Sequence, residues 1–514
     1  MSGHLQSCAI RDPRVDGLSF NRTFFYYGRM KLTTSCVMLA VLIIIIGIAI
    51  SSFRKSTKWD YAWVHHASNV REFIPNNISD LVAFLEHTAH SHGRVCIKGA
   101  GYSHGGNTLA DDSTQIDMRN LRKMRYDVNS TPSGLLTVEA GATWRSVLIY
   151  LATHGRTVAE MQSYHNFSVG GSVAVNCHGR GLQYGTISDT ITSMRVCDAS
   201  GRVWECSDSE NRELFYGSIG GYASLGIIVE VTVYTVPNIL LYPEVVRDIP
   251  VEGAQGLMAA PAPPDVVFFN AVLYPGNYDT LVVYSWRRSL FSPDEDDDKI
   301  PIPEITPEVC DSGSLYRFRY WGPMLFEQVL RRLPGVSRVR ETVEPILHDN
   351  NDTQRLRSYV TATDAVQLHG IIRYPSTTVL QEYFVPVSRV REALSSLIPH
   401  FRKMNVVNVS LRYVKKATRC VLNYAPVDSV SIVLYVNVWN TSRGLRTFEE
   451  LTDAMIAEVC RLEGRFYLPY LLSYDASAVR RMYGRDWEEL VRLKKKFDPS
   501  RRFQNMMYEH MSTT

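Results

Sequence analysis

The chain has 514 residues, 45% of them hydrophobic, and because one hydrophobic core rarely serves this length, two or more packed units are expected. Its 55 lysines and arginines are nearly balanced by 52 aspartates and glutamates, which leaves a formal net charge of +3. No dense basic block with interleaved aromatic residues occurs, so the composition argues against a nucleic-acid partner.

Residues 32–53, LTTSCVMLAVLIIIIGIAISSF, form an apolar segment without charges. At about 1.5 Å rise per residue the segment is long enough to cross a hydrocarbon layer of roughly 30 Å. It predicts a single transmembrane helix after an N-terminal tail, residues 1–31. A cleaved signal peptide is the alternative, but the segment is long for one and no clear small-residue cleavage site follows it. Basic residues flank both ends, so the positive-inside rule leaves the orientation open.

Seven of the nine cysteines lie beyond this segment, at irregular spacing and without a CxxC pair. This pattern predicts neither a disulfide framework nor a zinc site, so no metal is expected. Because it favours a reducing environment, we expect a single-pass membrane protein whose folded domain lies in the cytosol.

Strand and helix signals then alternate. In SDLVAFLEHTAHSHG, Ser79 is expected to begin a helix and Gly93 to end it. In TWRSVLIYLATHG, apolar residues at helical spacing lie between a Thr143 cap and a Gly155 stop. These helices belong to a first folded unit of residues 60–240.

The same unit contains a predicted hairpin that turns at residues 199–201 and a strand, GIIVEVTVYTV, that ends near Pro237. Beyond it, strands such as LQEYFVPV and VVNVSLRYVKK alternate with helices near residues 388–404 and 445–463, which predicts a second, α+β unit. A basic helix is expected to end before Pro499.

The stretch IKGAGYSHGGN, residues 97–107, places four glycines around Tyr102, Ser103 and His104. Glycine lets the backbone approach a ligand closely, and successive free N–H groups can bind a pyrophosphate. The stretch is neither a Walker A loop nor a Rossmann fingerprint, since no Gly-Lys-Ser/Thr follows and His104 stands at the third glycine position. By itself, a ligand-free glycine-rich turn explains it equally well.

Two further glycine clusters follow, FSVGGSVAVNCHGRG at residues 167–181 and GSIGGYASLGII at residues 217–228. A ligand that runs along three loops needs close backbone approach at each of them, whereas a small metabolite does not. The clusters therefore indicate one extended dinucleotide, and FAD fits this demand better than NAD.

These stretches carry a family resemblance. KGAGYSHGGN, SVGGSVAVNCHGRG and GGYASLGIIVEVTV resemble the FAD-binding half of the vanillyl-alcohol oxidase/p-cresol methylhydroxylase (PCMH-type) family over residues 60–240. LQEYFVPVSRV, NVSLRYVKK, RFYLPYLLSYDAS and KKKFDPSRRFQN resemble the C-terminal half of the aldonolactone and sugar oxidases and of the decaprenylphosphoryl-ribose oxidases.

The resemblance implies an α+β protein with a two-subdomain PCMH-type FAD-binding domain, residues 60–240. It also implies an α+β substrate or cap domain, residues 241–514, whose C-terminal segment returns to the flavin. One N-terminal transmembrane helix would precede both. The residues it assigns to FAD binding belong to the three glycine clusters: Gly99, Ala100, Gly101, Tyr102, Ser103, His104, Gly105, Gly106, Asn107, Gly170, Gly171, Ser172, His178, Gly179, Ile227 and Ile228.

One position departs from the family. Many lactone oxidases attach FAD covalently through a histidine just before the loop serine, and Tyr102 stands there in this chain. Attachment at that position is therefore ruled out by chemistry, while a shifted linkage through His104 remains open. We expect tightly but noncovalently bound FAD.

His178 matches a histidine that decaprenylphosphoryl-ribose oxidases place beside the flavin ring, although a lone histidine is more often structural. Hydride transfer also needs a base for the substrate hydroxyl proton and groups that steady the reduced ring. In NVSLRYVKK, alternation places Tyr413 and Lys415 on one strand face and Arg412 on the other. A Tyr/Lys face would accept the proton, whereas an Arg face would bind substrate oxygens; an ordinary amphipathic surface strand is the alternative.

Gln381 and Tyr383 in LQEYFVP share a strand face and are predicted to line the pocket, with Glu382 pointing away. Core packing explains Tyr383 nearly as well.

Together these features predict a membrane-anchored FAD-dependent oxidoreductase similar to D-arabinono-1,4-lactone oxidase. It would oxidise the C–OH or lactol carbon of a sugar, an aldonolactone or a lipid-linked sugar, with oxygen, a quinone or a cytochrome as electron acceptor. The alternatives are a flavin-dependent reductase of an unsaturated lipid, like the sterol side-chain reductases, and a catalytically inactive, membrane-anchored binding module.

Overall fold

The computed structural model describes residues 57–89, 93–130, 134–259, 262–276, 278–288, 354–362 and 375–513. The chain divides into two units, Met1–Ser56 and Thr57–Thr514. The predicted tail and the apolar segment of residues 32–53 lie outside the described residues. Within the described ranges, no helix combines the length and apolar character needed to cross a membrane. The six cysteines of these ranges are free thiols.

The first part of the folded unit contains two sheets. The parallel sheet has the order β3-β5-β4, and the antiparallel sheet has the order β10-β9-β11-β7-β6, with β8 paired to β11. A short pair, β1-β2, precedes them. The strand bounds are β1 Lys58–Trp59, β2 His66–Ala67, β3 Arg71–Phe73, β4 Arg94–Lys98, β5 Ser113–Asp117, β6 Met124–Asp127, β7 Leu135–Glu139, β8 Arg156–Val158, β9 Ile191–Cys197, β10 Val203–Ser207 and β11 Ile227–Pro237.

Short helices connect these strands, and their bounds are α2 Ile78–His87, α3 Trp144–Ala152, α4 Val169–Ala174 and α5 Arg212–Ser218, with 3-10 turns η1 Met118–Asn120 and η2 Ile187–Thr190. Helix α3 buries Trp144, Val147, Leu148 and Leu151, whose spacing places them on one side of the helix. The β11 strand alternates buried and half-buried residues after its first three positions, as expected for a strand with one face in the core.

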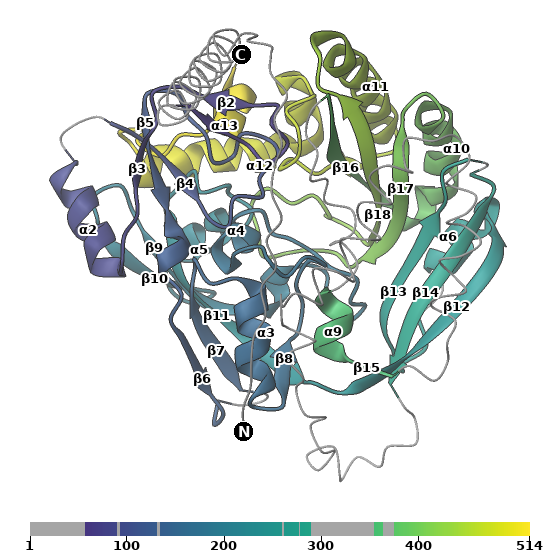
Figure 1. Cartoon of the computed structure of the whole chain (residues 1–514), viewed down its shortest axis with the longest axis horizontal. Coiled ribbons are helices and arrows are strands. Elements are labelled where there is room, and N and C mark those ends of the chain that lie inside the picture. Colours follow the sequence, from purple (N-terminus) through teal and green to yellow (C-terminus); the bar gives the residue numbers. More distant parts are fainter. Residues whose placement is uncertain are drawn as a thin grey trace, which may run out of the picture. The chain divides into compact units, whose positions relative to one another are not determined.

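The second part is an eight-stranded antiparallel sheet with the order β15-β12-β14-β13-β17-β18-β16-β19. Its strands are β12 Leu240–Pro250, β13 Val266–Leu273, β14 Thr280–Arg288, β15 Arg355–Leu356, β16 Ser376–Pro386, β17 Val406–Val414, β18 Ser429–Trp439 and β19 Arg465–Phe466. Helices α6 Ala254–Ala259, α10 Val390–Phe401 and α11 Ser442–Arg461 pack together, and α10 and α11 contact β16. Figure 1 shows these helices on the side of the sheet that faces away from the first two sheets. The opposite face of the sheet is therefore left for the site.

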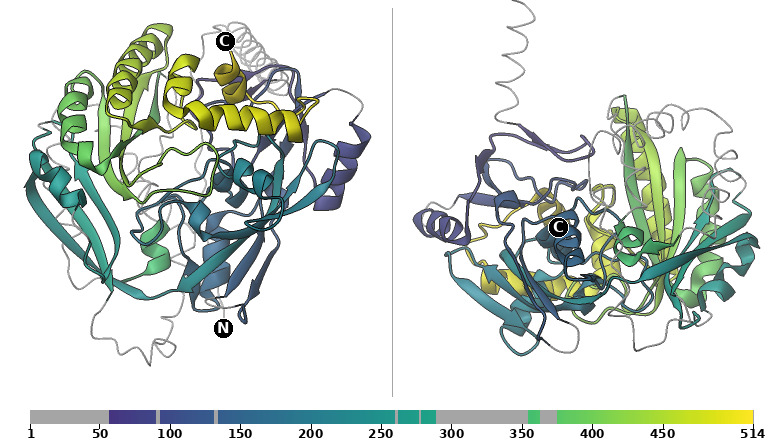
Figure 2. Two further views of the ribbon diagram at one scale, coloured as in Figure 1. Left: turned by 180° about the vertical axis from the view of Figure 1, so that it is seen from behind. Right: turned by 60° about the horizontal axis from the view of Figure 1, so that its bottom comes forward.

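The C-terminal segment returns to the first part of the fold. After α12 Ala476–Phe497, Val95 in β4 and Phe503 form a parallel bridge, and α13 Met506–Ser512 follows. The Lys494 ammonium is buried and donates hydrogen bonds to Ser224 O at 2.6 Å, to Asp498 Oδ2 at 2.5 Å and to Phe503 O. Figure 2 shows α12, in yellow, across the purple and blue part of the unit. The remaining short elements are α9 Arg357–Ala362, η3 Val251–Gly253 and η7 Val387–Arg389.

Several local predictions are confirmed, and those for the two ends of α2 are wrong. Thr143 caps α3, the hairpin between β9 and β10 turns where expected, and α12 ends before Pro499. Helix α2, however, begins after Asn77, whose side chain accepts from Asp80 N–H, and not after Ser79. An asparagine oxygen at that position satisfies a free N–H of the first turn, so the helix starts two residues earlier. The helix also ends earlier than predicted, at His87 with Thr88 as its C-cap, and not at Gly93.

Candidate functional site

Two sets of elements enclose one cavity in the described part of the chain. The predicted cofactor residues that line it come from all three glycine clusters: Gly99, Ala100, Gly101, Tyr102, Ser103, His104, Asn107, Gly170, Gly171, Ser172, His178 and Ile228. The opposite wall comes from β16, β17 and β18 through Leu380, Glu382, Arg412, Val433 and Tyr435. Stretches that are far apart in the sequence thus converge on one site.

The glycines allow the loops to approach one another closely. A Cβ atom at Gly99 would lie 2.1 Å from Ser168 Oγ, and one at Gly170 would lie 2.6 Å from Ala140 Cβ. Gly101 has a φ of +84°, a left-handed conformation that favours glycine. Ala100 N–H donates to Ser168 Oγ at 3.2 Å, which joins the first cluster to the second. Backbone therefore lies along the cavity wall, as a bound dinucleotide requires.

Four of the predicted cofactor residues do not line the cavity. Gly105 packs against Tyr470 O, and Gly106, at a φ of +64°, packs against Met506. A Cβ at Gly179 would collide with Glu160 and with Met161 O, so its free side faces away from the cavity. Ile227 is fully buried in a separate core cluster, because strand alternation turns Ile228 instead to the cavity.

An aromatic group surrounds the position where the family carries its covalent histidine. The Tyr102 ring lies 5.0 Å from the Tyr61 ring, 5.1 Å from the Tyr164 ring and 5.2 Å from the Phe167 ring, between centroids. Burial, together with the hydrogen bond to Tyr102, raises the pKa of Tyr164 far above its usual value. The Tyr164 phenol therefore stays neutral and forms part of the cavity wall, not a base.

A histidine–carboxylate pair connects the two walls of the cavity. His178 Nε2 lies 2.5 Å from Glu382 Oε1, and both side chains are 3% exposed. Ser431 Oγ also donates to Glu382 Oε1, and Tyr470 OH donates to Oε2 at 3.1 Å. A contact this short between nitrogen and oxygen needs a proton between them, so the pair holds one proton at the cavity.

The same contacts keep Glu382 ionisable at this depth. Burial by itself would raise the pKa of Glu382, but His178, Ser431 and Arg412 outweigh burial and hold it below its usual value. The carboxylate therefore remains available as a hydrogen-bond and proton acceptor at neutral pH.

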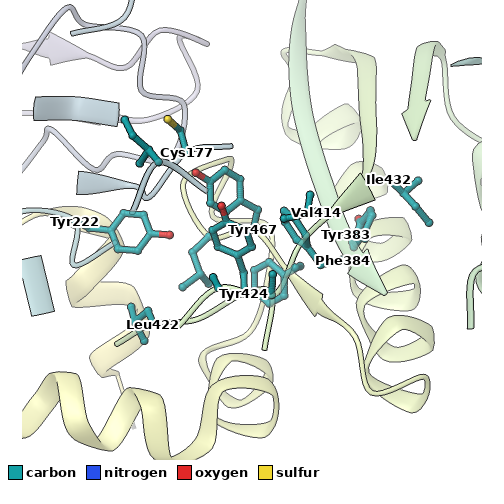
Figure 3. Packing of buried hydrophobic residues seen from close by; sticks show 14 of the residues in the cluster. Cys177, Tyr222, Tyr383, Phe384, Val414, Leu422, Tyr424, Ile432 and Tyr467 are labelled. Atoms are coloured by element: carbon teal, nitrogen blue, oxygen red, sulfur yellow. The ribbon is translucent and has the colours of Figure 1, made fainter. Parts of the chain in front are cut away.

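Two tyrosines fix the backbone that carries His178. Tyr424 OH donates to Asn176 O at 2.5 Å, and Tyr467 OH donates to Val175 O at 2.7 Å. Figure 3 shows Tyr424 and Tyr467 between Cys177 and Tyr222 on one side and the strand with Phe384 on the other. The turn before the histidine includes Asn176 at a φ of +49°, and these two hydrogen bonds hold it in place.

The prediction for the LQEYFVP strand is wrong in its choice of face. Glu382 lines the cavity, whereas Gln381 and Tyr383 point to the opposite side, where the Tyr383 side chain lies near Thr452 and Asp453 of α11. Nearly every residue of β16 is buried, because helices cover one face and the site covers the other. Alternation alone could therefore not say which face meets the cofactor, and no local signal identified Glu382.

The two faces of β17 have different surroundings in the structure. Arg412 lines the cavity. Tyr413 OH instead donates to Asp428 Oδ2 at 2.7 Å, and Lys415 is exposed. Burial and Asp428 raise the pKa of Tyr413 to about 12, and neither Tyr413 nor Lys415 lines the cavity, so the geometry does not support the Tyr/Lys face as the base.

A second buried carboxyl lies just behind the site. Both oxygens of Glu160 are buried without a hydrogen-bond partner, against Gly179 and Gly181. Burial raises the pKa of Glu160 from 4.5 to about 8, although Arg357 and Arg180 act in the opposite direction.

The raised pKa predicts how stability depends on pH. The folded protein keeps the Glu160 proton up to about pH 8, whereas the unfolded chain releases it near 4.5, so stability falls as pH rises between these values. Glu160→Gln should remove this loss. In denaturant titrations, the unfolding free energy of the parent should fall by about 5 kcal/mol relative to that of the variant as pH rises from below 4.5 to above 8. If the unfolding free energies of the parent and the variant changed equally with pH, the raised pKa of Glu160 would be contradicted.

Comparisons with known proteins agree with the geometry. A family model described as an FAD binding domain matches residues 71–207, and one described as berberine and berberine like matches residues 435–506. The first model covers the first two glycine clusters and ends before the third, and the second model begins at Tyr435, the last of the five residues of the opposite wall.

Curated relatives match about a third of the chain. An uncharacterized oxidoreductase of the fasciation locus of Rhodococcoides fascians is 30% identical over 34% of this chain and 39% of its own length. The D-arabinono-1,4-lactone oxidase of Yarrowia lipolytica is 31% identical over 32% of each chain. The L-gulonolactone oxidase of Bos taurus is 26% identical over 32% of this chain and 37% of its own. The chain thus spans well under half the length of these relatives.

A solved structure extends the similarity to nearly the whole chain. Cholesterol oxidase from B. sterolicum has a TM-score of 0.65 and covers 89% of this chain and 97% of its own, at 14% identity. At this identity the likeness establishes the fold alone.

Proposed function

We propose that this chain, which carries the FAD-binding domain of the PCMH-type FAD-linked oxidoreductases, is a membrane-anchored FAD-dependent oxidoreductase. It oxidises the C–OH or lactol carbon of a sugar, an aldonolactone or a lipid-linked sugar and passes the electrons to oxygen, a quinone or a cytochrome. One observation carries the proposal: the proton-holding pair His178–Glu382 lies in the same cavity as the glycine clusters.

The cavity supplies the groups that alcohol oxidation needs. Bound FAD supplies the acceptor for the hydride that leaves the carbon bearing the hydroxyl group. The Glu382 carboxylate, oriented by Ser431 and Tyr470, receives the hydroxyl proton together with His178. Arg412 lies beside them and binds the substrate oxygen as negative charge develops on it.

The side chains of the wall opposite the glycine loops indicate which kind of substrate the cavity would bind. Leu380, Val433 and Tyr435 line the cavity beside Glu382 and Arg412, so polar groups occupy only part of this wall. Within the proposed classes this favours an amphiphilic alcohol, such as a lipid-linked sugar. The same apolar wall keeps a reductase of an unsaturated lipid as the second candidate.

Anaerobic reduction tests the proposal. The purified full-length protein, reconstituted with FAD, should show flavin absorption bands. Aldonolactones, free sugars and polyprenyl-phosphate sugars are then added without oxygen, and bleaching of the bands identifies the substrate class. Absence of bands with excess FAD would refute the oxidoreductase. A bound flavin that no alcohol reduces, but that an unsaturated lipid reoxidises after the flavin has been reduced chemically with dithionite, would favour the reductase.

Noncovalent attachment gives a separate prediction. Because Tyr102 cannot form the histidyl bond of the lactone oxidases, acid precipitation should leave the flavin in the supernatant. His104 lines the same cavity and stacks on Tyr61, with ring centroids 5.4 Å apart, so it is the matched control position. Flavin that stays with the denatured chain in the parent but is released in His104→Ala would show a linkage through His104 instead.

A further inference from the structure

The exposed tryptophans of the described residues are Trp59, Trp63 and Trp439, with exposed fractions of 49%, 42% and 61%. The other described tryptophans, Trp144, Trp204, Trp286 and Trp487, are buried or half-buried. Large apolar side chains that remain exposed together on a folded protein indicate a surface that meets a partner.

The three tryptophans lie on adjoining segments. The rings of Trp59 and Trp63 are 6.3 Å apart between centroids. Asn440, the residue after Trp439, donates through Nδ2 to Trp63 O at 3.0 Å. Figure 1 shows β2 and α11, which flank these segments, toward the same side of the folded unit. We call the surface formed by Trp59, Trp63 and Trp439 the tryptophan face.

The tryptophan face continues into the walls of the cavity. Trp439 ends β18, and alternation places it on the same strand face as Val433 and Tyr435, which line the cavity. On the other wall Tyr61, between the two N-terminal tryptophans, stacks on His104 and contacts Tyr102. The distance along β18 from Tyr435 to Trp439 is about 13 Å at a strand rise of about 3.3 Å per residue.

Basic residues accompany the tryptophans. Arg443 and Arg446 are exposed at the start of α11, directly after Trp439. Positive charge is unfavourable at a helix N-terminus, so helix stability does not explain these arginines. Indole rings with neighbouring guanidinium groups are the side chains that favour the headgroup layer of a bilayer with anionic lipid.

The sequence links this face to the apolar segment. Only six positions separate Phe53, the last residue of the proposed membrane span, from Trp59. Even a fully extended chain of that length reaches no more than about 21 Å. This short tether limits how far Trp59 can lie from the end of the proposed membrane span.

We propose that the tryptophan face docks on the headgroup layer of a lipid bilayer and brings the cavity walls next to the membrane. An amphiphilic alcohol can then move from the bilayer along the β18 face toward Glu382 without crossing bulk water. The docking itself rests on the proposed anchor and the exposed tryptophans, not on the reaction.

Quenching by brominated lipid tests the docking. The full-length protein is reconstituted into vesicles of phosphatidylcholine and phosphatidylserine with bromine on the upper acyl chain, and into matched vesicles without bromine. We expect bromine to quench the tryptophan emission of the parent. The combined variant Trp59→Tyr, Trp63→Tyr, Trp439→Tyr should lose more than half of that quenching. The combined control Trp204→Phe, Trp286→Phe, which changes half-buried rings, should retain it.

Other results would overturn the docking. Equal parent emission in both vesicles, or failure of the protein to float with them, would exclude contact of this face with lipid. Quenching that persists unchanged in the triple variant would assign the contact to another surface. Flavin content of the triple variant, measured in parallel, separates lost folding from lost docking, and each single variant repeats the test if the triple variant does not fold. None of these measurements depends on catalytic activity, so they test the docking independently of the proposed reaction.

Discussion

Glu382→Gln should slow the reduction of the flavin by substrate about 100-fold while leaving flavin content unchanged. The amide keeps the shape of the carboxylate but cannot receive a proton. The hydrogen-bonding contacts of His178, Ser431 and Tyr470 then lose their charged partner. Because Arg412 is unchanged, the loss should fall on the rate of reduction more than on substrate binding. Anaerobic stopped-flow absorption separates the two quantities.

Tyr413→Phe is the matched control for this prediction. Tyr413 was also predicted from the sequence as a catalytic residue, but its hydroxyl bonds Asp428 outside the cavity. Its removal should change the reduction rate less than about twofold, which is the range of surface substitutions. If Tyr413→Phe slowed flavin reduction strongly and Glu382→Gln did not, the catalytic base would lie on the Tyr/Lys face and not at Glu382.

Gly105→Ala should lower the affinity for FAD more than tenfold and destabilise the fold by about 2 to 3 kcal/mol. The added Cβ would lie 2.0 Å from Tyr470 O, a backbone atom that cannot rotate away as a side chain can. Relief requires a shift of the first glycine loop or of the segment that bears Tyr470. Either shift moves a wall of the cavity. Flavin titration and denaturant unfolding measure the two effects.

Gly256→Ala provides the control for a glycine substitution as such. Gly256 lies in α6, and apart from its chain neighbours and the backbone of its own helix no atom comes within 4 Å of the position where its Cβ would stand. Alanine is the better helix former, so this variant should be as stable as the parent or slightly more stable, with unchanged flavin binding. If Gly105→Ala behaves like Gly256→Ala, the close packing of the loop on Tyr470 does not hold in solution.

Local chemistry made part of the fold predictable. A threonine before an apolar helical run, a short turn between two alternating segments and a proline after a basic helix each act within a few residues. The Thr143 cap, the β9–β10 hairpin and the end of α12 therefore follow from the sequence. The start of α2 was missed because Asn77 and Ser79 can both cap, and local pattern does not rank them.

The glycine clusters made the cofactor side of the site predictable, since each cluster marks a place where backbone must approach closely, and the three clusters line one cavity. The catalytic side was decided only by tertiary structure. β16 is buried on both faces, and the packing of α11 against one of them turned Tyr383 toward the helix and Glu382 toward the cavity. A pattern of alternation separates two faces of a strand, but only the neighbouring elements determine which face meets the site.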